Sequence, residues 1–426
     1  MRRDYIALNY KPKSSEVIAE YYMEPEKDHK FEEVATAVAG ESSIDTWTDI
    51  KTLSPALAKK LKPHVYNLDK RKKIIKVAYH KELFELGSVA QLLSSIAGNI
   101  FSMKMVANLR LLDVKFPKEM VKWYKGPKFG IKGIRRILKS GNRPLLGTIV
   151  KPKMGLSSRE HAQVAFESWV GGLDLVKDDE NLTDQKFNNF RERVRKTLEM
   201  RNRAEILCRC KKIYMPNITA PTVQEMIKRA EYVKEKGGEY IMVDVVTSGW
   251  TALQSLRVAN EKLKLVLHGH RCMHSAMTRN PKHGISMMVV AKLVRLIGLD
   301  QLHTGTIVGK MEGGSKEVLD IDFEMEHELV KEDNFHNVLT QKWQHLRRLM
   351  PVASGGVQPL MIPEMYKYFG KDIIIQLGGG VHAHPQGTRA GAKAAAQALV
   401  AALRYIPLKQ HAKSNPELAL AIKKWG

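Results

Sequence analysis

From Arg143 to the C-terminus, short apolar runs alternate with longer amphipathic stretches. This alternation is typical of βα units around a parallel sheet. Eight runs are predicted as strands: Pro144–Lys151, Leu173–Lys177, Lys212–Ile218, Tyr240–Val246, Leu263–His270, Gln301–Ile307, Met350–Ser354 and Ile373–Leu377. Eight units over about 260 residues match a (β/α)8 TIM barrel in number and length.

The residues before this region have a mixed pattern, with short apolar runs and one longer stretch at helical spacing. The predicted strands are Tyr5–Tyr10, Phe31–Ala39 and Ile74–Ala78, and the predicted helix is Gln91–Leu112. A basic, glycine-containing segment at 122–140 indicates a boundary. The expected fold class is therefore α/β, with an N-terminal α+β domain at 1–125, a basic connector at 126–142 and a (β/α)8 barrel catalytic domain with C-terminal helices at 143–426.

The composition predicts a soluble, enzyme-sized protein, because 44% of the 426 residues are hydrophobic and 27% are charged. No uncharged apolar run is long enough to span a bilayer, and Met1–Tyr5 leads directly into polar sequence. We therefore expect a cytoplasmic protein without a membrane partner. Three cysteines are too few for a disulfide framework and fit a reducing compartment.

The chain is strongly basic, with 69 Lys and Arg against 45 Asp and Glu and a net charge of +24. Such a field attracts nucleic acids, anionic membranes or phosphorylated substrates without selecting among them. The positive charge is dispersed, and no nucleic-acid-binding motif accompanies it. We interpret it mainly as solvated surface and do not expect a nucleic acid partner. A non-enzymatic, nucleic-acid-associated basic protein is the alternative.

Chemically distinctive residues follow six of the predicted barrel strands, each at the C-terminal end. They are Lys151 and Lys153, then Lys177, Asp179 and Glu180, then His270, Arg271 and His274, then His303 and Lys310, and finally Ser354–Gly356 and Gly378–Gly380. The C-terminal ends of barrel strands converge on one mouth, where barrel enzymes place their active sites. This coincidence indicates an enzyme.

The sequence Lys177-Asp178-Asp179-Glu180 ends the second predicted strand. Because side chains alternate along a strand, Lys177 and Asp179 are expected to share a face while Asp178 points elsewhere. Converging carboxylates of Asp179 and Glu180 suit a hard cation such as Mg²⁺. A neutral lysine amine is a poor third ligand, whereas a lysine carrying CO2 as a carbamate is a good one. The alternative is a solvated acidic helix start.

Three further patterns have open interpretations. The glycine-rich turns after the last two strands suit either phosphate binding by backbone N–H groups or a tight βα turn. The glycines around Lys310 suit either a hinged lid or an ordinary exposed lysine. His268-Gly269-His270-Arg271-Cys272-Met273-His274 suits a zinc site or the His-x-His pair of amidohydrolase-type barrels, although Arg271 favours anion binding.

Taken together, these motifs resemble the large, catalytic subunit of ribulose-1,5-bisphosphate carboxylase/oxygenase (RuBisCO), specifically the archaeal form III type. The resemblance spans nearly the whole chain and rests on Gly147–Leu156, Gly171–Glu180, His270–His274, His303–Lys310, Val352–Gly356, Gln376–Gly380, Glu41–Ser43 with Thr46 and Trp47, and Gly98 with Asn99. It implies carboxylation of ribulose 1,5-bisphosphate to two 3-phosphoglycerates, with O2 as a competing substrate, and a place in AMP salvage.

The resemblance also implies catalytic roles. Lys177, carbamylated by activator CO2, would bind one Mg²⁺ with Asp179 and Glu180, and the metal would stabilise an enediolate. The carbamate would remove the C3 proton, Lys151 would protonate the cleaved carbanion, and His270 would assist proton transfer. On the lid, Lys310 would orient CO2 and pair with Glu41.

The substrate contacts are implied in the same way. Arg271 and His303 would bind one phosphate, and backbone groups in the late glycine turns would bind the other. The full expected substrate-binding set is Lys153, Arg271, His303, Ser354, Gly355, Gly356, Gly378, Gly379, Thr46, Trp47 and Asn99. Two departures from plant-type enzymes bear on this set: Ile149 replaces a threonine near the substrate, and Asp45 replaces a common glycine.

The resemblance implies an assembly as well. Glu41, Thr46, Trp47 and Asn99 would come from the neighbouring subunit of a head-to-tail homodimer with two shared active sites. Form III enzymes often assemble further into five dimers, a decamer, and no small subunit is expected. The rival within the family is a RuBisCO-like enolase or isomerase without carboxylation. Such proteins typically lose Lys310 or phosphate-site residues, which this chain retains.

Overall fold

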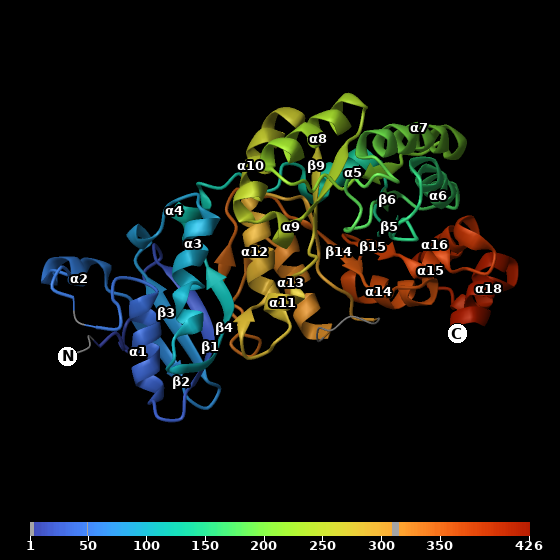
Figure 1. Ribbon diagram of the computed structural model, residues 1–426. Helices are drawn as coiled ribbons and strands as arrows, with labels where there is room; N and C mark the ends of the chain where they lie inside the picture. The colour runs from blue at the N-terminus through green and yellow to red at the C-terminus, as the bar shows by residue number, and fades with distance from the viewer. Residues whose placement is uncertain (1–3, 49, 309–314) are drawn as a thin grey trace. The chain divides into compact units, whose positions relative to one another are not determined.

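The computed structural model describes residues 4–48, 50–308 and 315–426, and these form two compact units (Figure 1). The first unit comprises the chain up to Gly126 together with Met273–Ile297 and His327–Leu346. The second comprises Pro127–Cys272, Gly298–Glu326 and Arg347–Gly426. Among the described residues, no helix combines the length and apolarity that crossing a bilayer requires.

The first unit contains a five-stranded sheet in the order β10-β4-β1-β3-β2. The strands are β1 (Val17–Pro25), β2 (His64–Asp69), β3 (Ile74–Tyr79), β4 (Val106–Lys115) and β10 (Gly284–Ile285). Its pairs are antiparallel except for β10 beside β4. The strand predicted at Ile74–Ala78 is confirmed as β3, and Tyr79 extends it.

The strand predicted at Phe31–Ala39 is wrong, because this segment is helix α1 (Phe31–Glu41). Its buried residues are Val34, Ala35, Val38, Ala39 and Gly40. That spacing follows the 3.6-residue helical period and not the two-residue period of a strand. Glu32 and Glu33 in the first turn favour the helix further, since acids are stabilising near a helix N-terminus.

The helix predicted at Gln91–Leu112 is also wrong over most of its length. Helix α3 (Val89–Ile96) ends before Gly98, and β4 begins at Val106. A Cβ atom on Gly98 would lie 2.1 Å from the Ser94 carbonyl oxygen, so the backbone turns where only glycine fits. The predicted strand Tyr5–Tyr10 is reduced to one bridge between Ile6 and Val65.

The second unit is a parallel eight-stranded barrel, which confirms all eight predicted strands in order. The strands are β5 (Leu145–Ile149), β6 (Leu175–Lys177), β7 (Ile213–Met215), β8 (Tyr240–Asp244), β9 (Val266–His270), β11 (Gln301–His303), β14 (Met350–Ser354) and β15 (Ile374–Leu377). Beyond the end of β7, the backbone N–H of Ile218 donates to the Met242 carbonyl at 2.9 Å, and this contact closes the barrel.

Successive barrel residues pack into different layers. Leu145 and Ile374 belong to a core that includes helix α5 (Gly130–Leu138), whereas their neighbours Leu146 and Ile375 pack in a second cluster with residues of α16 (Gly387–Leu403). This is the alternation expected for strands buried on both faces. The other helices of this unit include α6 (Ser158–Val170), α7 (Phe190–Cys208), α8 (Val223–Glu235), α10 (Trp250–Leu263), α13 (Ser315–Glu326), α14 (Ile362–Phe369), α16 (Gly387–Leu403) and α18 (Pro416–Trp425).

Candidate active site

Lys177 is the last residue of β6, and its side chain is completely buried. Its Nζ donates to the Asp178 carbonyl oxygen at 2.7 Å and lies 3.3 Å from the Met242 sulfur. Burial lowers the pKa of Lys177, although the surrounding carboxylates, with Glu180 the strongest, act to raise it. Burial therefore favours the neutral, nucleophilic form of this amine more than solvent does for an exposed lysine.

Asp178 points away from this group, as the strand alternation predicted. Its carboxylate accepts hydrogen bonds from Tyr214 Oη at 2.7 Å, Arg193 Nε at 3.0 Å and the Asn217 backbone N–H at 3.0 Å. All three partners are buried. A buried carboxylate with three donors is a structural ion pair, so Asp178 is excluded from the candidate ligands.

Asp179 and Glu180 face two lysines that follow β5. Lys151 Nζ lies 2.6 Å from Asp179 Oδ2, and Lys153 Nζ lies 3.4 Å from Glu180 Oε1. Burial alone would raise the pKa of Glu180, but the nearby His270 and Lys177 charges lower it to about 2. The structure thus brings the five residues predicted on the first two strands into one cluster.

Two buried histidines, His268 within β9 and His303 at the end of β11, form a chain. His268 Nε2 lies 2.9 Å from His303 Nε2, while Gln301 Oε1 lies 2.8 Å from His268 Nδ1 and Ser354 Oγ lies 2.6 Å from His303 Nδ1. Burial lowers the pKa of His268 to about 3 and that of His303 well below its ordinary value. Both imidazoles are therefore neutral at physiological pH and can exchange hydrogen bonds without carrying charge.

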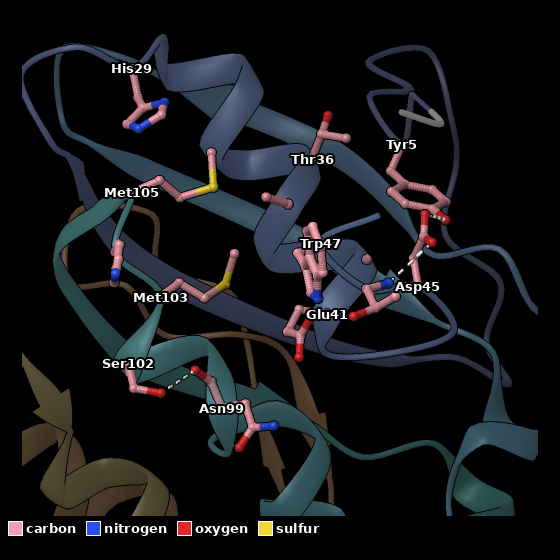
Figure 2. A pocket seen from close by; sticks show the side chains of 14 residues that line it. Tyr5, His29, Thr36, Glu41, Asp45, Trp47, Asn99, Ser102, Met103 and Met105 are labelled. Carbon is pink, nitrogen blue, oxygen red and sulfur yellow. Dashed lines mark hydrogen bonds between the residues drawn. The ribbon is translucent and has the colours of Figure 1, made fainter. Parts of the chain in front are cut away.

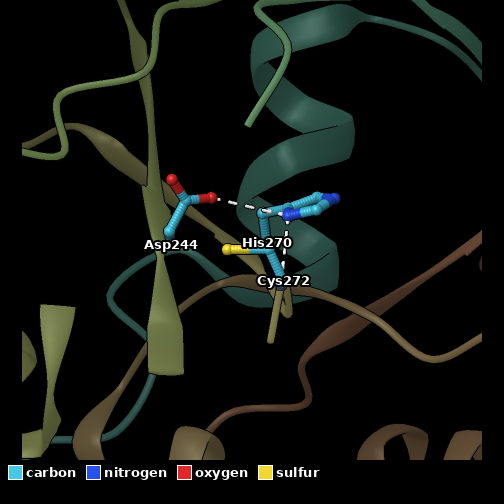
Figure 3. A group of neighbouring side chains, drawn as sticks. All are labelled: Asp244, His270 and Cys272. Carbon is cyan, nitrogen blue, oxygen red and sulfur yellow. Dashed lines mark hydrogen bonds and ion pairs between the residues drawn. The ribbon is translucent and has the colours of Figure 1, made fainter. Parts of the chain in front are cut away.

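His270 lies between the carboxylates of Glu180 and Asp244, and Figure 3 shows Asp244 beside it. Its Nε2 is 3.6 Å from Glu180 Oε2, and its Nδ1 is 3.4 Å from Asp244 Oδ1. Sequence reasoning missed Asp244, which is the last residue of β8. The available signal was an acid at the C-terminal end of a predicted strand. His268 does not join the other residues of the motif that was considered as a zinc site, because it contacts Gln301 and His303 instead.

The Arg271 guanidinium lies close to Gly305. A Cβ on Gly305 would lie 3.0 Å from Arg271 Nη2, and Gly305 has φ of +117°, so glycine is required beside the guanidinium. Burial lowers the pKa of Arg271 to about 10, and the Asp322 and Glu317 carboxylates counteract this. The same burial raises the pKa of Asp322 to about 8. An anionic ligand would complete this desolvated cation.

The predicted glycine turns follow β14 and β15. Gly355 and Gly356 have φ of +117° and +73°, which favour glycine. Gly378 approaches the Lys151 side chain, whose Cε would lie 3.5 Å from a Cβ placed there, and the space beside Gly379 is open. These turns therefore leave backbone exposed next to the lysine and carboxylate cluster.

The predicted residues of the first unit line a cavity of their own, of about 810 Å³ (Figure 2). Glu41 ends α1, Thr46 and Trp47 follow it, and Asn99 lies beside the break in the chain after α3. Trp47 is 78% exposed, which is unusual for its size. Asp45, noted as a departure, accepts a hydrogen bond from Tyr5 Oη at 2.9 Å. Lys310 lies outside the described residues.

Both parts of the chain match family models. Residues 4–120 match the model described as ribulose bisphosphate carboxylase large chain, N-terminal domain, and residues 130–425 match the catalytic domain of the same chain. The protein belongs to the ribulose bisphosphate carboxylase large-chain family. Within this RuBisCO family, the candidate site lies in the catalytic domain match and the cavity of Figure 2 in the N-terminal match.

The relatives are archaeal and similar over their full length. Ribulose bisphosphate carboxylase of Methanosarcina mazei is 56% identical over 100% of this chain and 99% of its own, and that of Methanocaldococcus jannaschii is 49% identical over 99% and 100%. Among solved structures, the octameric RuBisCO of Pyrococcus horikoshii is 48% identical with a TM-score of 0.92 over 99% of this chain and 96% of its own. The dimeric RuBisCO of Hyperthermus butylicus is 42% identical with a TM-score of 0.93 over 99% and 98%.

Proposed function

We propose that this protein is a ribulose-bisphosphate carboxylase that adds CO2 and water to ribulose 1,5-bisphosphate and yields two 3-phosphoglycerates, with O2 as a competing substrate. The observation that carries the proposal is the completely buried Lys177 amine beside Asp179 and Glu180 at the barrel mouth. The full-length relatives named ribulose bisphosphate carboxylase support the same reaction.

The donor set fits one Mg²⁺. Asp179 and Glu180 provide hard oxygen ligands, and both now face lysine ammonium groups that a cation can replace. Lys177 would complete the set as a carbamate: its neutral amine forms an N–C bond to CO2 and releases one proton to solvent. When bound, Mg²⁺ supplies Lewis acidity toward the sugar oxygens and raises the acidity of the neighbouring C–H.

The remaining side chains have separate tasks. Lys177, as a carbamate, would accept the C3 proton of the sugar, and Lys151, whose Nζ lies 2.6 Å from Asp179 Oδ2, would donate a proton to the carbanion left by C–C cleavage. His270, between Glu180 and Asp244, moves protons during hydration. Arg271 and His303 bind one phosphate, and the glycine turns bind the other through backbone N–H groups.

Completion of the site by a second subunit is part of the proposal. Glu41, Thr46, Trp47 and Asn99 lie together in the first unit, and the exposed Trp47 is suited to being covered by a partner. The Pyrococcus and Hyperthermus relatives are described as octameric and dimeric. We therefore propose a homodimer with shared active sites. Mass photometry would test whether these dimers assemble further into a decamer. A cytoplasmic place in AMP salvage is proposed from the family resemblance.

The deciding experiment is incorporation of labelled CO2 into 3-phosphoglycerate after preincubation with bicarbonate and Mg²⁺. We expect turnover only when both were present during preincubation. Exchange of the C3 proton without labelled product would instead identify a RuBisCO-like enolase. Lys310→Ala is expected to retain C3 proton exchange and lose CO2 addition, and equal loss of both would contradict the role of that lysine.

A further inference from the structure

Asp244, His270 and Cys272 form a second cluster of metal-ligating side chains, distinct from the carboxylates proposed for Mg²⁺ (Figure 3). Asp244 ends β8, His270 ends β9, and Cys272 follows two residues later. One ligand atom from each residue lies within 4.8 Å of the other two. Figure 3 shows the Cys272 sulfur directed to the side of His270 on which Asp244 lies.

The Asp244 carboxylate is 2% exposed and only half satisfied. Oδ2 accepts hydrogen bonds from Asn217 Nδ2 and Thr219 Oγ1, both at 3.2 Å, and these bonds fix the orientation of the group. Oδ1 receives no nitrogen or oxygen donor from the part of the chain that the structure describes. The groups nearest to Oδ1 are the His270 ring, at 3.4 Å, and the Cys272 thiol, so a cation bound between these three groups would compensate the buried carboxylate more fully.

The His270 ring presents a lone pair toward the same point. The backbone N–H of Cys272 donates to His270 Nδ1 at 3.2 Å, which makes Nδ1 the unprotonated nitrogen. Nδ1 and Asp244 Oδ1 thus face each other at 3.4 Å as two acceptors. The other ring nitrogen faces the Glu180 carboxylate at 3.6 Å, and metal-bound histidines usually direct their second nitrogen toward a carboxylate in this way.

We propose that Asp244, His270 and Cys272 bind one thiophilic divalent cation of the zinc class. A thiolate and a carboxylate neutralise the two positive charges, and sulfur with imidazole nitrogen suits a borderline-soft ion. Three protein ligands leave one of four positions to water. Mg²⁺ requires an octahedron of oxygens and does not compete for this site.

The thiol is protonated until the cation arrives. Burial, followed by the Asp244 charge, raises the pKa of Cys272 to about 12. The bond that forms is between sulfur and metal, and the displaced thiol proton leaves to solvent. The consequence for catalysis rests on the proposed function: a cation on Nδ1 holds His270 in place, removes it from proton transfer and inhibits carboxylation reversibly.

Cobalt(II) is the probe that tests the site, because it follows zinc in ligand preference and reports thiolate ligation by absorption. Chelator-treated protein in excess Mg²⁺ is titrated with Co²⁺. We expect one equivalent per chain with a thiolate-to-cobalt charge-transfer band. Cys272→Ser is expected to lose the band, and Asp244→Asn to weaken binding by about tenfold or more. Cys210→Ser removes an exposed cysteine elsewhere and should retain the band.

Absence of the band in the unmodified protein, or its persistence in Cys272→Ser, would overturn the proposed site. Zinc inhibition of labelled-CO2 incorporation then tests the consequence. We expect inhibition that a chelator reverses in the unmodified and Cys210→Ser proteins, and zinc-insensitive residual activity in Cys272→Ser. A cobalt band in a protein that never carboxylates would refute the proposed function while the cation site stands. A band together with zinc-insensitive carboxylation would refute the inhibitory role.

Discussion

Buried carboxylates at the two ends of the barrel differ in how completely they are hydrogen-bonded. At the N-terminal end, Asp300 accepts backbone N–H groups of Phe129, Gly130 and Leu267, and Asp174 forms a bidentate pair with Arg143. At the C-terminal mouth, Asp244 Oδ1 lacks a nitrogen or oxygen donor among the described residues. Charges that stabilise the barrel are saturated by fixed partners, whereas charges at the mouth are left with capacity for a ligand.

The same difference separates neighbours in one short segment. Asp178 is enclosed by Arg193 and Tyr214, while Asp179 contacts the partly exposed Lys151. One residue of displacement along the strand turns a structural ion pair into a candidate ligand. Substitutions at both ends of the barrel test this division between stabilising and reactive charge.

The largest effect is expected from removal of the mouth lysine. Lys177→Ala should reduce labelled-CO2 incorporation by about 10⁴-fold or more, because it removes the base and a ligand of the cation together. The matched control is Lys212→Ala, which removes another buried lysine whose Nζ donates to the Leu173 carbonyl at 2.7 Å. Lys212→Ala should lower stability and retain turnover per folded chain. Robust turnover in Lys177→Ala would reject the assignment.

A stability effect is expected at the opposite end of the barrel. Asp300→Ala should decrease the free energy of unfolding by about 3 kcal/mol, because it leaves three backbone N–H groups without an acceptor and uncaps α5. Urea denaturation measures this change. Asp300→Asn retains one acceptor oxygen and should lose less. If Asp300→Ala instead reduced carboxylation per folded chain, the division between the two ends would fail.

A pH-dependent effect is expected from Asp322, whose pKa burial raises from about 3.8 to about 8. Between these two values the folded chain binds more protons than the unfolded chain, so stability falls as pH rises through that window. The contribution amounts to at most about 1.4 kcal/mol per pH unit. Asp322→Asn should flatten the dependence of the denaturation midpoint on pH between about 4 and about 8. An unchanged slope would show that Asp322 titrates normally.

The smallest effect is expected at Ser354, whose Oγ lies 2.6 Å from His303 Nδ1. Ser354→Ala should raise KM for the bisphosphate by about fivefold, since it removes a hydrogen bond of about 1 kcal/mol that orients a phosphate-binding imidazole. Thr222→Ala removes the N-cap of α8 and should change stability alone. A larger change in kcat than in KM would move Ser354 from substrate binding to the chemical step.

The barrel could be predicted from the sequence because the pattern that marks each strand is local and repeats along the chain. Each strand is a short apolar run, each reactive residue follows one, and the parallel topology brings those ends to one mouth. The elements of the N-terminal domain were predicted less accurately. Phe31–Ala39 has apolar residues that fit a short strand by composition, and only their burial at helical spacing identifies α1. The segment Gln91–Leu112 contains most of helix α3, a break at Gly98 and the first part of strand β4.

The amino-acid sequence by itself determined the fold class, the order of the barrel strands and the cluster of Lys151, Lys177, Asp179 and Glu180, because strand alternation and topology follow from local pattern. Only the tertiary structure decided which charges are satisfied. Asp174, Asp178 and Asp244 are indistinguishable as acids at strand ends, and their different roles depend on donors from distant segments. Burial depends on the whole packed chain, so the lowered pKa of Lys177 became visible only in the folded protein.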